Sequence, residues 1–235
     1  MVKIASSLLA ADFAHLGDEI RTVQSAGADM VHLDIMDGHF VPNISFGPAV
    51  AALSKLISPL PHDAHLMVTE PENYIESFAK TGVEYIIFHI EIEGIKKDLG
   101  AGKWVYVADN IRHPQRIKNV IERIKKAGCK AGLTLNPPTK MEVAYPYLKE
   151  VDLLLLMSVN PGFAGQKFIP EVYEKIPAAA HHRQENKLNF EIMIDGGVGL
   201  DNARELIKSG ADILVAGSSF FGSSDRTSFI HQMKS

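Results

Sequence analysis

Two ionisable side chains and a methionine alternate with apolar residues in one short segment of the sequence. Segment 31–38 reads Val-His-Leu-Asp-Ile-Met-Asp-Gly, so His32, Asp34 and Met36 occupy every second position. Successive side chains of a β-strand point to opposite faces, which places these three on one face and the aliphatic residues between them on the other. A buried imidazole and carboxylate need a partner that offsets their desolvation, and a metal ion is one such partner. An isolated His-x-Asp pair is more often hydrogen-bonded or solvated, so the metal interpretation depends on further residues.

Two residues of the same chemical types accompany other strand-like segments. His65 lies in the third apolar run, and Asp195 directly follows the run 190–194. In a parallel barrel the C-terminal ends of all strands converge on one mouth, so distance in sequence is no obstacle to a shared site. Nitrogen and carboxylate ligands without thiolate suit one divalent ion, Zn, Fe(II), Mn or Co, and the sequence does not choose among them. The predicted metal ligands are His32, Asp34, His65 and Asp195.

The elements that must position these residues recur along the whole chain. Apolar runs of strand length alternate with amphipathic stretches of helical period. The expected strands are 2–9, 30–35, 63–68, 85–90, 130–135, 153–159, 190–194 and 213–216. The expected helices are 13–25, 48–57, 72–80, 114–126, 141–149, 170–184, 200–209 and one from residue 226. Eight strand–helix units in 235 residues predict an α/β protein: a (β/α)8 TIM barrel forming one domain over residues 1–235.

One segment, at about 92–112 after the fourth strand, is longer than a usual strand–helix loop. This insertion contains the only tryptophan, Trp104, and residues 103–107 could form a short accessory strand. Barrel geometry brings the insertion out at the C-terminal face, where sites are built. It could be a lid, a surface elaboration or a subunit contact, and the sequence leaves these open.

Glycine-rich segments follow the last three expected strands, at 160–166, 195–198 and 216–219. Backbone N–H groups in such loops can approach an anion, and barrels often bind phosphate after their last two strands. One such loop would be weak evidence because tight turns also favour glycine, whereas three at consecutive strand ends predict a phosphate site. Met36, Met67 and Met157 occupy corresponding late positions on the second, third and sixth expected strands. Their default role is core packing, and near a metal they would also line an apolar pocket.

Composition limits the kinds of partner that this protein is expected to bind. The formal net charge is −4, so no basic surface for nucleic acid is expected, and no long apolar run suggests a membrane segment. The single cysteine, Cys129, excludes an intramolecular disulfide, and the N-terminus carries no apolar signal region. We expect a cytoplasmic protein with a small-molecule partner.

Seven motifs in combination resemble the ribulose-phosphate 3-epimerase family, and the match runs along nearly the whole chain. They lie at 6–13, 32–43, 65–67, 135–137, 157–166, 195–198 and 216–218. The resemblance implies a metal-dependent TIM barrel of the pentose phosphate pathway that interconverts D-ribulose 5-phosphate and D-xylulose 5-phosphate. It also implies two-base proton transfer at C3 through an enediolate, and a homo-oligomer.

The resemblance assigns roles to individual residues of this chain. Asp34 and Asp195 become the catalytic acid and base, and the four predicted ligands become the metal site. Substrate binding falls to Ser7, His65, Gly162, Phe163, Ala164, Gly165, Gly196, Gly197, Gly217 and Ser218.

Other functions remain open at this point. The insertion beside the mouth and the Phe-Ala-Gly form of the loop at 163–165 leave D-allulose 6-phosphate 3-epimerase as an alternative. A metal-assisted aldolase or decarboxylase would be expected to add a basic residue or a different acid at the strand ends, and no lysine lies in the core of the expected strands. A non-catalytic sugar-phosphate-binding protein would lose one acid/base carboxylate, yet both Asp34 and Asp195 are present.

Overall fold

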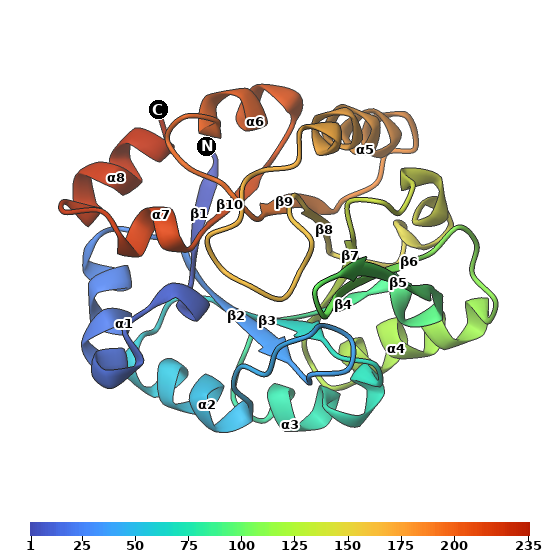
Figure 1. Cartoon of the computed structure of the whole chain (residues 1–235), viewed down its shortest axis with the longest axis horizontal. Helices are drawn as coiled ribbons and strands as arrows, with labels where there is room; N and C mark the ends of the chain where they lie inside the picture. The colour runs from blue at the N-terminus through green and yellow to red at the C-terminus, as the bar shows by residue number, and fades with distance from the viewer.

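Eight parallel strands close into a barrel in the computed structural model, which describes residues 1–235. Their order around the barrel is β1-β10-β9-β8-β7-β4-β3-β2 (Figure 1). The barrel strands are β1 (Lys3–Ser7), β2 (Met30–Met36), β3 (His62–Met67), β4 (Tyr85–His89), β7 (Lys130–Leu135), β8 (Leu153–Met157), β9 (Glu191–Asp195) and β10 (Ile213–Ala216). The predicted TIM barrel is confirmed.

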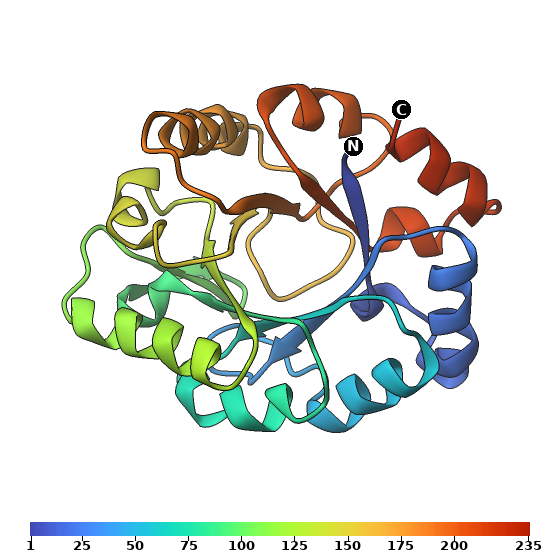
Figure 2. The ribbon, with the colours of Figure 1, turned by 180° about the vertical axis from the view of Figure 1, so that it is seen from behind.

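The helices form a ring outside the strands, visible from both ends of the barrel in Figures 1 and 2. They are α1 (Leu16–Ser25), α2 (Pro48–Ile57), α3 (Ile75–Ala79), α4 (Pro114–Lys126), α5 (Lys175–Glu185), α6 (Ala203–Ser209), α7 (Ser218–Phe221) and α8 (Arg226–Met233). None of them combines the length and apolar character that crossing a membrane would require.

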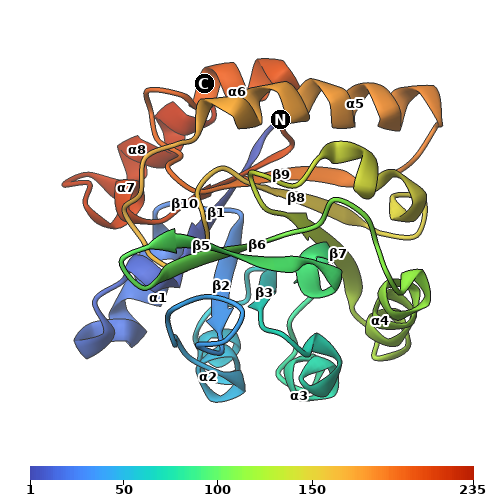
Figure 3. The ribbon, with the colours of Figure 1, turned by 45° about the vertical axis from the view of Figure 1, so that its right-hand side comes forward.

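The remaining two strands form a hairpin outside the barrel. β5 (Ile95–Gly100) pairs antiparallel with β6 (Lys103–Val107), and Figure 3 shows the hairpin lying across the end of the barrel. β6 is the accessory strand expected at residues 103–107. Every residue of β5 is exposed, whereas Val105 and Val107 of β6 are buried, so β6 is the strand that packs onto the protein.

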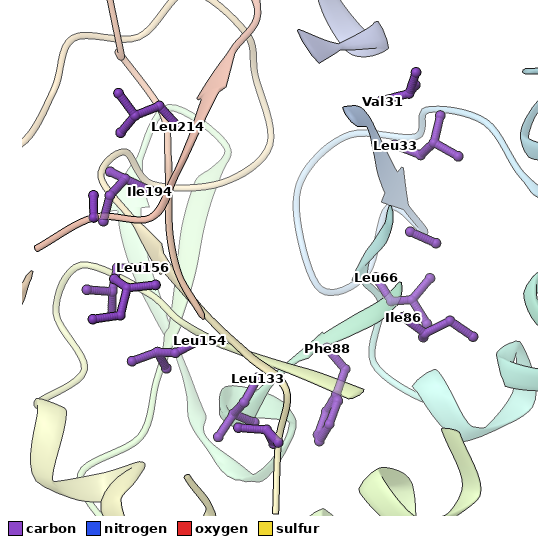
Figure 4. Close-up of a cluster of buried hydrophobic side chains, with 14 of the residues drawn as sticks. Val31, Leu33, Leu66, Ile86, Phe88, Leu133, Leu154, Leu156, Ile194 and Leu214 are labelled. Carbon is purple, nitrogen blue, oxygen red and sulfur yellow. The ribbon is translucent and has the colours of Figure 1, made fainter. Parts of the chain in front are cut away.

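The register of β2 turns its ionisable face toward the inside of the barrel. Val31 and Leu33 belong to the apolar core between the strands and the helices (Figure 4), whereas His32 and Asp34 belong to the inner face. Burying a side chain such as Leu33 stabilises the fold by about 1.5–3 kcal/mol. A slip of one residue would exchange the two faces, so hydrophobic burial fixes the inward direction of His32 and Asp34.

Most expected elements agree with the structure to within two or three residues at their ends, but one helix is wrong. Residues 141–149 form two short 3-10 turns, η5 (Met141–Val143) and η6 (Tyr145–Tyr147), instead of an α-helix. The apolar period there is interrupted by Pro146, which has no N–H to donate and whose ring crowds the preceding turn. Further 3-10 turns are η1 (Leu8–Ala10), η2 (Phe13–His15), η3 (Pro71–Asn73), η4 (Ile90–Glu93) and η7 (Pro170–Glu174).

Candidate active site and metal centre

The four predicted ligands meet inside the barrel at the C-terminal ends of β2, β3 and β9. One ligand atom from each of them lies within 4.8 Å of all the others, and all four residues are buried. Asp34 Oδ1 is 3.2 Å from both His32 Nε2 and His65 Nδ1. Asp195 Oδ2 is 3.6 Å from His32 Nε2 and 3.8 Å from His65 Nδ1. Two imidazole nitrogens and two carboxylate oxygens therefore face one small volume.

Asp63 supports His32 from behind. His32 Nδ1 lies 2.7 Å from Asp63 Oδ1, and neither side chain is exposed. The contact is short but bent from good hydrogen-bond alignment, and Asp63 has no other hydrogen-bond partner. A carboxylate facing Nδ1 favours a proton on that nitrogen, so the neutral His32 ring has its lone pair on Nε2, the atom that faces Asp34 and Asp195.

His65 is supported by a second buried chain. Its Nε2 lies 2.9 Å from Nε2 of His89, and Nδ1 of His89 lies 3.2 Å from Oε2 of Glu91. Both His89 and Glu91 are fully buried. Burial lowers the pKa of His89 to about 4, so this ring is neutral near pH 7.

The charges of the cluster favour a cation at its centre. Burial opposes a charged His32 ring, yet the carboxylates of Asp63 and Asp34 raise the pKa of His32 well above its ordinary value. Burial alone would also raise the pKa of Asp34, but the rings of His32 and His65 lower it below its ordinary range. The protons on the histidine rings supply positive charge between the carboxylates, and a divalent ion can supply positive charge at the same place. Imidazole nitrogens and carboxylate oxygens are also suitable ligands for such an ion. The residues therefore fit a metal ion.

A cavity opens above the cluster at the mouth of the barrel. The loop between β8 and α5 curls over the barrel centre in Figure 1 and supplies several of the lining residues. The structure brings fourteen of the predicted residues to this cavity: Ser7, Asp34, Met36, Met67, Met157, Gly162, Phe163, Ala164, Gly165, Asp195, Gly196, Gly197, Gly217 and Ser218. His32 and His65 do not line it, because both lie fully buried beneath its floor.

The glycines after β9 allow the chain to approach its neighbours closely. Gly196 and Gly197 have φ of 115° and 62°, and a Cβ added to them would lie 2.5 Å from Val159 Cγ2 and 2.4 Å from the Phe168 nitrogen. Side chains at these positions would clash, so the tight turn requires glycine. The backbone N–H of Gly197 donates to no protein acceptor, which leaves it available to a ligand.

Two serines hold the acidic residues in place. Ser7 Oγ donates a 2.5 Å hydrogen bond to Asp34 Oδ2, the oxygen that does not face the histidines. Ser158 Oγ donates to the backbone oxygens of Asp195 and Gly196 at 2.9 and 2.6 Å. Both carboxylates thus lie on pinned strand ends rather than on free loops.

The sequence interpretation missed three buried residues of the site: Asp63, His89 and Glu91. The alternation of side chains carried a signal for one of them, since Asp63 precedes His65 by two positions and shares its face of β3. Glu91 lies in the 3-10 turn η4 after β4 ends at His89, so strand alternation gave no signal for it.

Comparison with known proteins decides the family. A model of the ribulose-phosphate 3 epimerase family matches residues 3–221. The chain belongs to this family. It is 42% identical over 235 residues to ribulose-phosphate 3-epimerase of Bacillus subtilis, covering 100% of this chain and 99% of the relative. It is 37% identical to the Escherichia coli ribulose-phosphate 3-epimerase, covering 99% and 94% of the two chains.

More distant solved structures share the fold of this chain. KGPDC from Streptococcus mutans superposes with a TM-score of 0.68 at 10% identity, covering 100% of this chain and 96% of that one. The 3-hexulose-6-phosphate synthase from Salmonella typhimurium gives a TM-score of 0.68 at 13% identity, covering 99% and 96%. Identities this low show the barrel architecture alone, so the function must be argued from the site.

Proposed function

We propose that this epimerase-family chain interconverts D-ribulose 5-phosphate and D-xylulose 5-phosphate by moving a proton at C3. The observation that carries the proposal is the meeting of Asp34 and Asp195 in one cavity, directly above two buried histidines. Inverting a carbon centre by proton transfer needs one group on each face, and these two carboxylates can supply them. The full-length similarity to curated ribulose-phosphate 3-epimerases supports the same activity.

His32, Asp34, His65 and Asp195 would hold one divalent ion, of Zn, Fe(II), Mn or Co type. Lewis-acid stabilisation of the negative charge that develops on the substrate is what such an ion supplies when bound. The protein must also hold the ligand side chains in a fixed orientation and keep water away from them.

C3 lies next to the C2 ketone, so loss of its proton gives an enediolate. In the first half of the reaction one aspartate, as carboxylate, takes the C3 proton and becomes a carboxylic acid. The other aspartate, already protonated, then gives its proton to the opposite face of C3. Asp34 serves as base in one direction and Asp195 in the other. The Ser7 hydrogen bond holds the Asp34 carboxylate in a fixed direction during both steps.

The far end of the sugar would be held by its phosphate. Gly197, Gly217 and Ser218 line the same cavity, and the N–H groups of Gly197 and Gly217 donate to no protein acceptor. Neutral N–H dipoles are suited to anions, which makes a cluster of basic residues unnecessary. Fixing the phosphate holds C3 between the two carboxylates, so binding energy is used for orientation. The methionines Met36, Met67 and Met157 would keep this part of the pocket apolar.

The relatives favour the pentose phosphate over D-allulose 6-phosphate, since those compared above are all ribulose-phosphate 3-epimerases. We also propose cytoplasmic action and assembly into a homo-oligomer, in line with the family resemblance. The deciding experiment compares kcat/KM on D-ribulose 5-phosphate and D-allulose 6-phosphate with the same metal-loaded enzyme. A higher value on the pentose phosphate is expected, and a higher value on allulose 6-phosphate would contradict the proposal.

A further inference from the structure

A buried chain of hydrogen-bonding groups leads from His65 away from the cavity. His65 Nε2 contacts His89 Nε2 at 2.9 Å, and His89 Nδ1 contacts Glu91 Oε2 at 3.2 Å. The other oxygen of Glu91, Oε1, accepts a 2.7 Å hydrogen bond from the backbone N–H of Asn136. None of these side chains is exposed, so water does not compete for their hydrogen bonds.

The hairpin closes this chain off from solvent. Tyr106 of β6 stacks on Phe40 with ring centres 4.9 Å apart, and Phe40 lies 4.8 Å from the His89 ring. The indole N–H of Trp104 donates to the Phe40 carbonyl oxygen at 3.1 Å. The insertion therefore packs over His89 and keeps its surroundings dry.

The direction of each hydrogen bond follows from its fixed end. A backbone N–H can only donate, so Glu91 accepts there, and its second oxygen faces a ring nitrogen that can give it a proton. His89 then carries its proton on Nδ1 and presents the bare Nε2 to His65. Only one proton fits between the two Nε2 atoms, so it belongs to His65. A neutral His65 ring then has its lone pair on Nδ1, the atom that faces Asp34 and Asp195.

We propose that His89 and Glu91 are positioning residues, which fix the tautomer of His65 so that its Nδ1 is available to a metal ion. This inference rests on the metal site of the proposed function. Glu91 acts through two rings and touches neither the ion nor the substrate, as a carboxylate behind a metal-binding histidine does.

The test is Glu91→Gln, which changes one oxygen into an NH2 group and keeps the shape. The amide oxygen is needed by the Asn136 N–H, so the NH2 group faces His89 Nδ1 and takes the place of an acceptor. His89 should then move its proton to Nε2, and His65 should move its own proton to Nδ1, where the ion would bind. We expect the Zn²⁺ affinity, measured by competition with a fluorescent chelator, to fall about 10- to 100-fold.

Glu93→Gln is the matched control. Glu93 is also buried beside the hairpin, but it pairs with His113 and Arg116 and not with this chain. The Glu93→Gln variant should bind Zn²⁺ with the affinity of the wild type. His89→Gln keeps one acceptor and one donor, so it should retain more affinity than His89→Phe.

A second readout observes the proton positions directly. Long-range ¹H–¹⁵N spectra of the Zn²⁺-loaded wild type should show His89 protonated at Nδ1 and His65 at Nε2, and in Glu91→Gln the His89 proton should appear at Nε2. Zn²⁺ affinity of Glu91→Gln within about twofold of wild type, or a wild-type His89 protonated at Nε2, would overturn this inference alone. A wild type that binds no divalent ion would instead overturn the metal site of the proposed function, and this inference with it.

Discussion

Replacing Asp63 with Asn should weaken metal binding while leaving the cavity unchanged. Asp63 faces His32 Nδ1 at 2.7 Å and lies outside the cavity lining. An asparagine of the same shape can present its NH2 group to that nitrogen, which would shift the His32 proton to Nε2, the atom facing Asp34 and Asp195. Loss of a carboxylate behind a metal-binding histidine typically costs 10- to 100-fold in metal affinity.

The size of the effect can be converted into a melting temperature. A ligand that binds only the folded state stabilises it by RT ln(1 + [L]/Kd), so at a fixed excess of metal a 10- to 100-fold weaker Kd removes about 1.4–2.7 kcal/mol. For a domain of this size, about 1 kcal/mol corresponds to roughly 2–4 °C in Tm. The rise in Tm on adding metal should therefore be about 3–11 °C smaller for Asp63→Asn than for wild type.

Thermal unfolding of each protein with and without the same concentration of Zn²⁺ measures this difference. Subtracting the metal-free Tm removes any direct effect of the substitution on the fold. Asp152→Asn is the control, because Asp152 accepts from the Ala131 N–H at the opposite end of the barrel and an amide oxygen can replace it there. An equal metal-induced rise in Asp63→Asn and wild type would refute the reasoning about His32.

Three further outcomes follow from the same geometry. Ser7→Ala removes the 2.5 Å hydrogen bond to the Asp34 carboxylate, and a charge-assisted hydrogen bond of this kind contributes about 1.5–3 kcal/mol. The value of kcat/KM in steady-state assays should therefore fall about 10- to 150-fold. An unchanged kcat/KM would contradict the orienting role of Ser7. Gly197→Ala forces a side chain into the left-handed region and against the Phe168 backbone, so it should lose at least about 1–2 kcal/mol of stability in denaturant titrations and raise KM for the sugar phosphate. Zn²⁺ affinity should rise with pH, because the raised pKa of His32 means that a proton must leave this ring before the ion binds. Calorimetry in buffers of different protonation enthalpy should detect the release of that proton. A Zn²⁺ affinity that does not change with pH would contradict this expectation.

The sequence predicted the inner layer of the site because barrel geometry alone brings strand ends together. His32 and Asp34 alternate on one strand, His65 lies near the C-terminal end of a second, and Asp195 ends a third. A closed parallel barrel therefore brings all four side chains to the same end. Three loops with glycine at the same end of the barrel were predictable for the same reason.

The outer layer depends on contacts that no local pattern specifies. To predict the pairing of His65 with His89, one must know the register between β3 and β4. To predict the stacking of Tyr106 on Phe40, one must know where the inserted hairpin lies over the barrel. The failed helix at residues 141–149 has a local cause, because Pro146 overrides an apolar period that otherwise looks helical.

The central claim is that Asp34 and Asp195 act on opposite faces of C3. It is tested most directly by following exchange of the C3 proton with D2O for each epimer separately, in wild type, Asp34→Asn and Asp195→Asn. Metal content must be measured in each variant, so that loss of the ion is not mistaken for loss of a base. Replacing one acid/base group typically slows the reaction about 10²- to 10⁴-fold.

The account predicts that wild type places deuterium at C3 of the epimerised product and that both variants lose epimerisation. Each metal-loaded variant should still exchange the C3 proton of one epimer, a different one in each case, because its remaining carboxylate reaches only one face. Near wild-type epimerisation by either variant, or exchange of the same epimer by both, would contradict the two-base assignment.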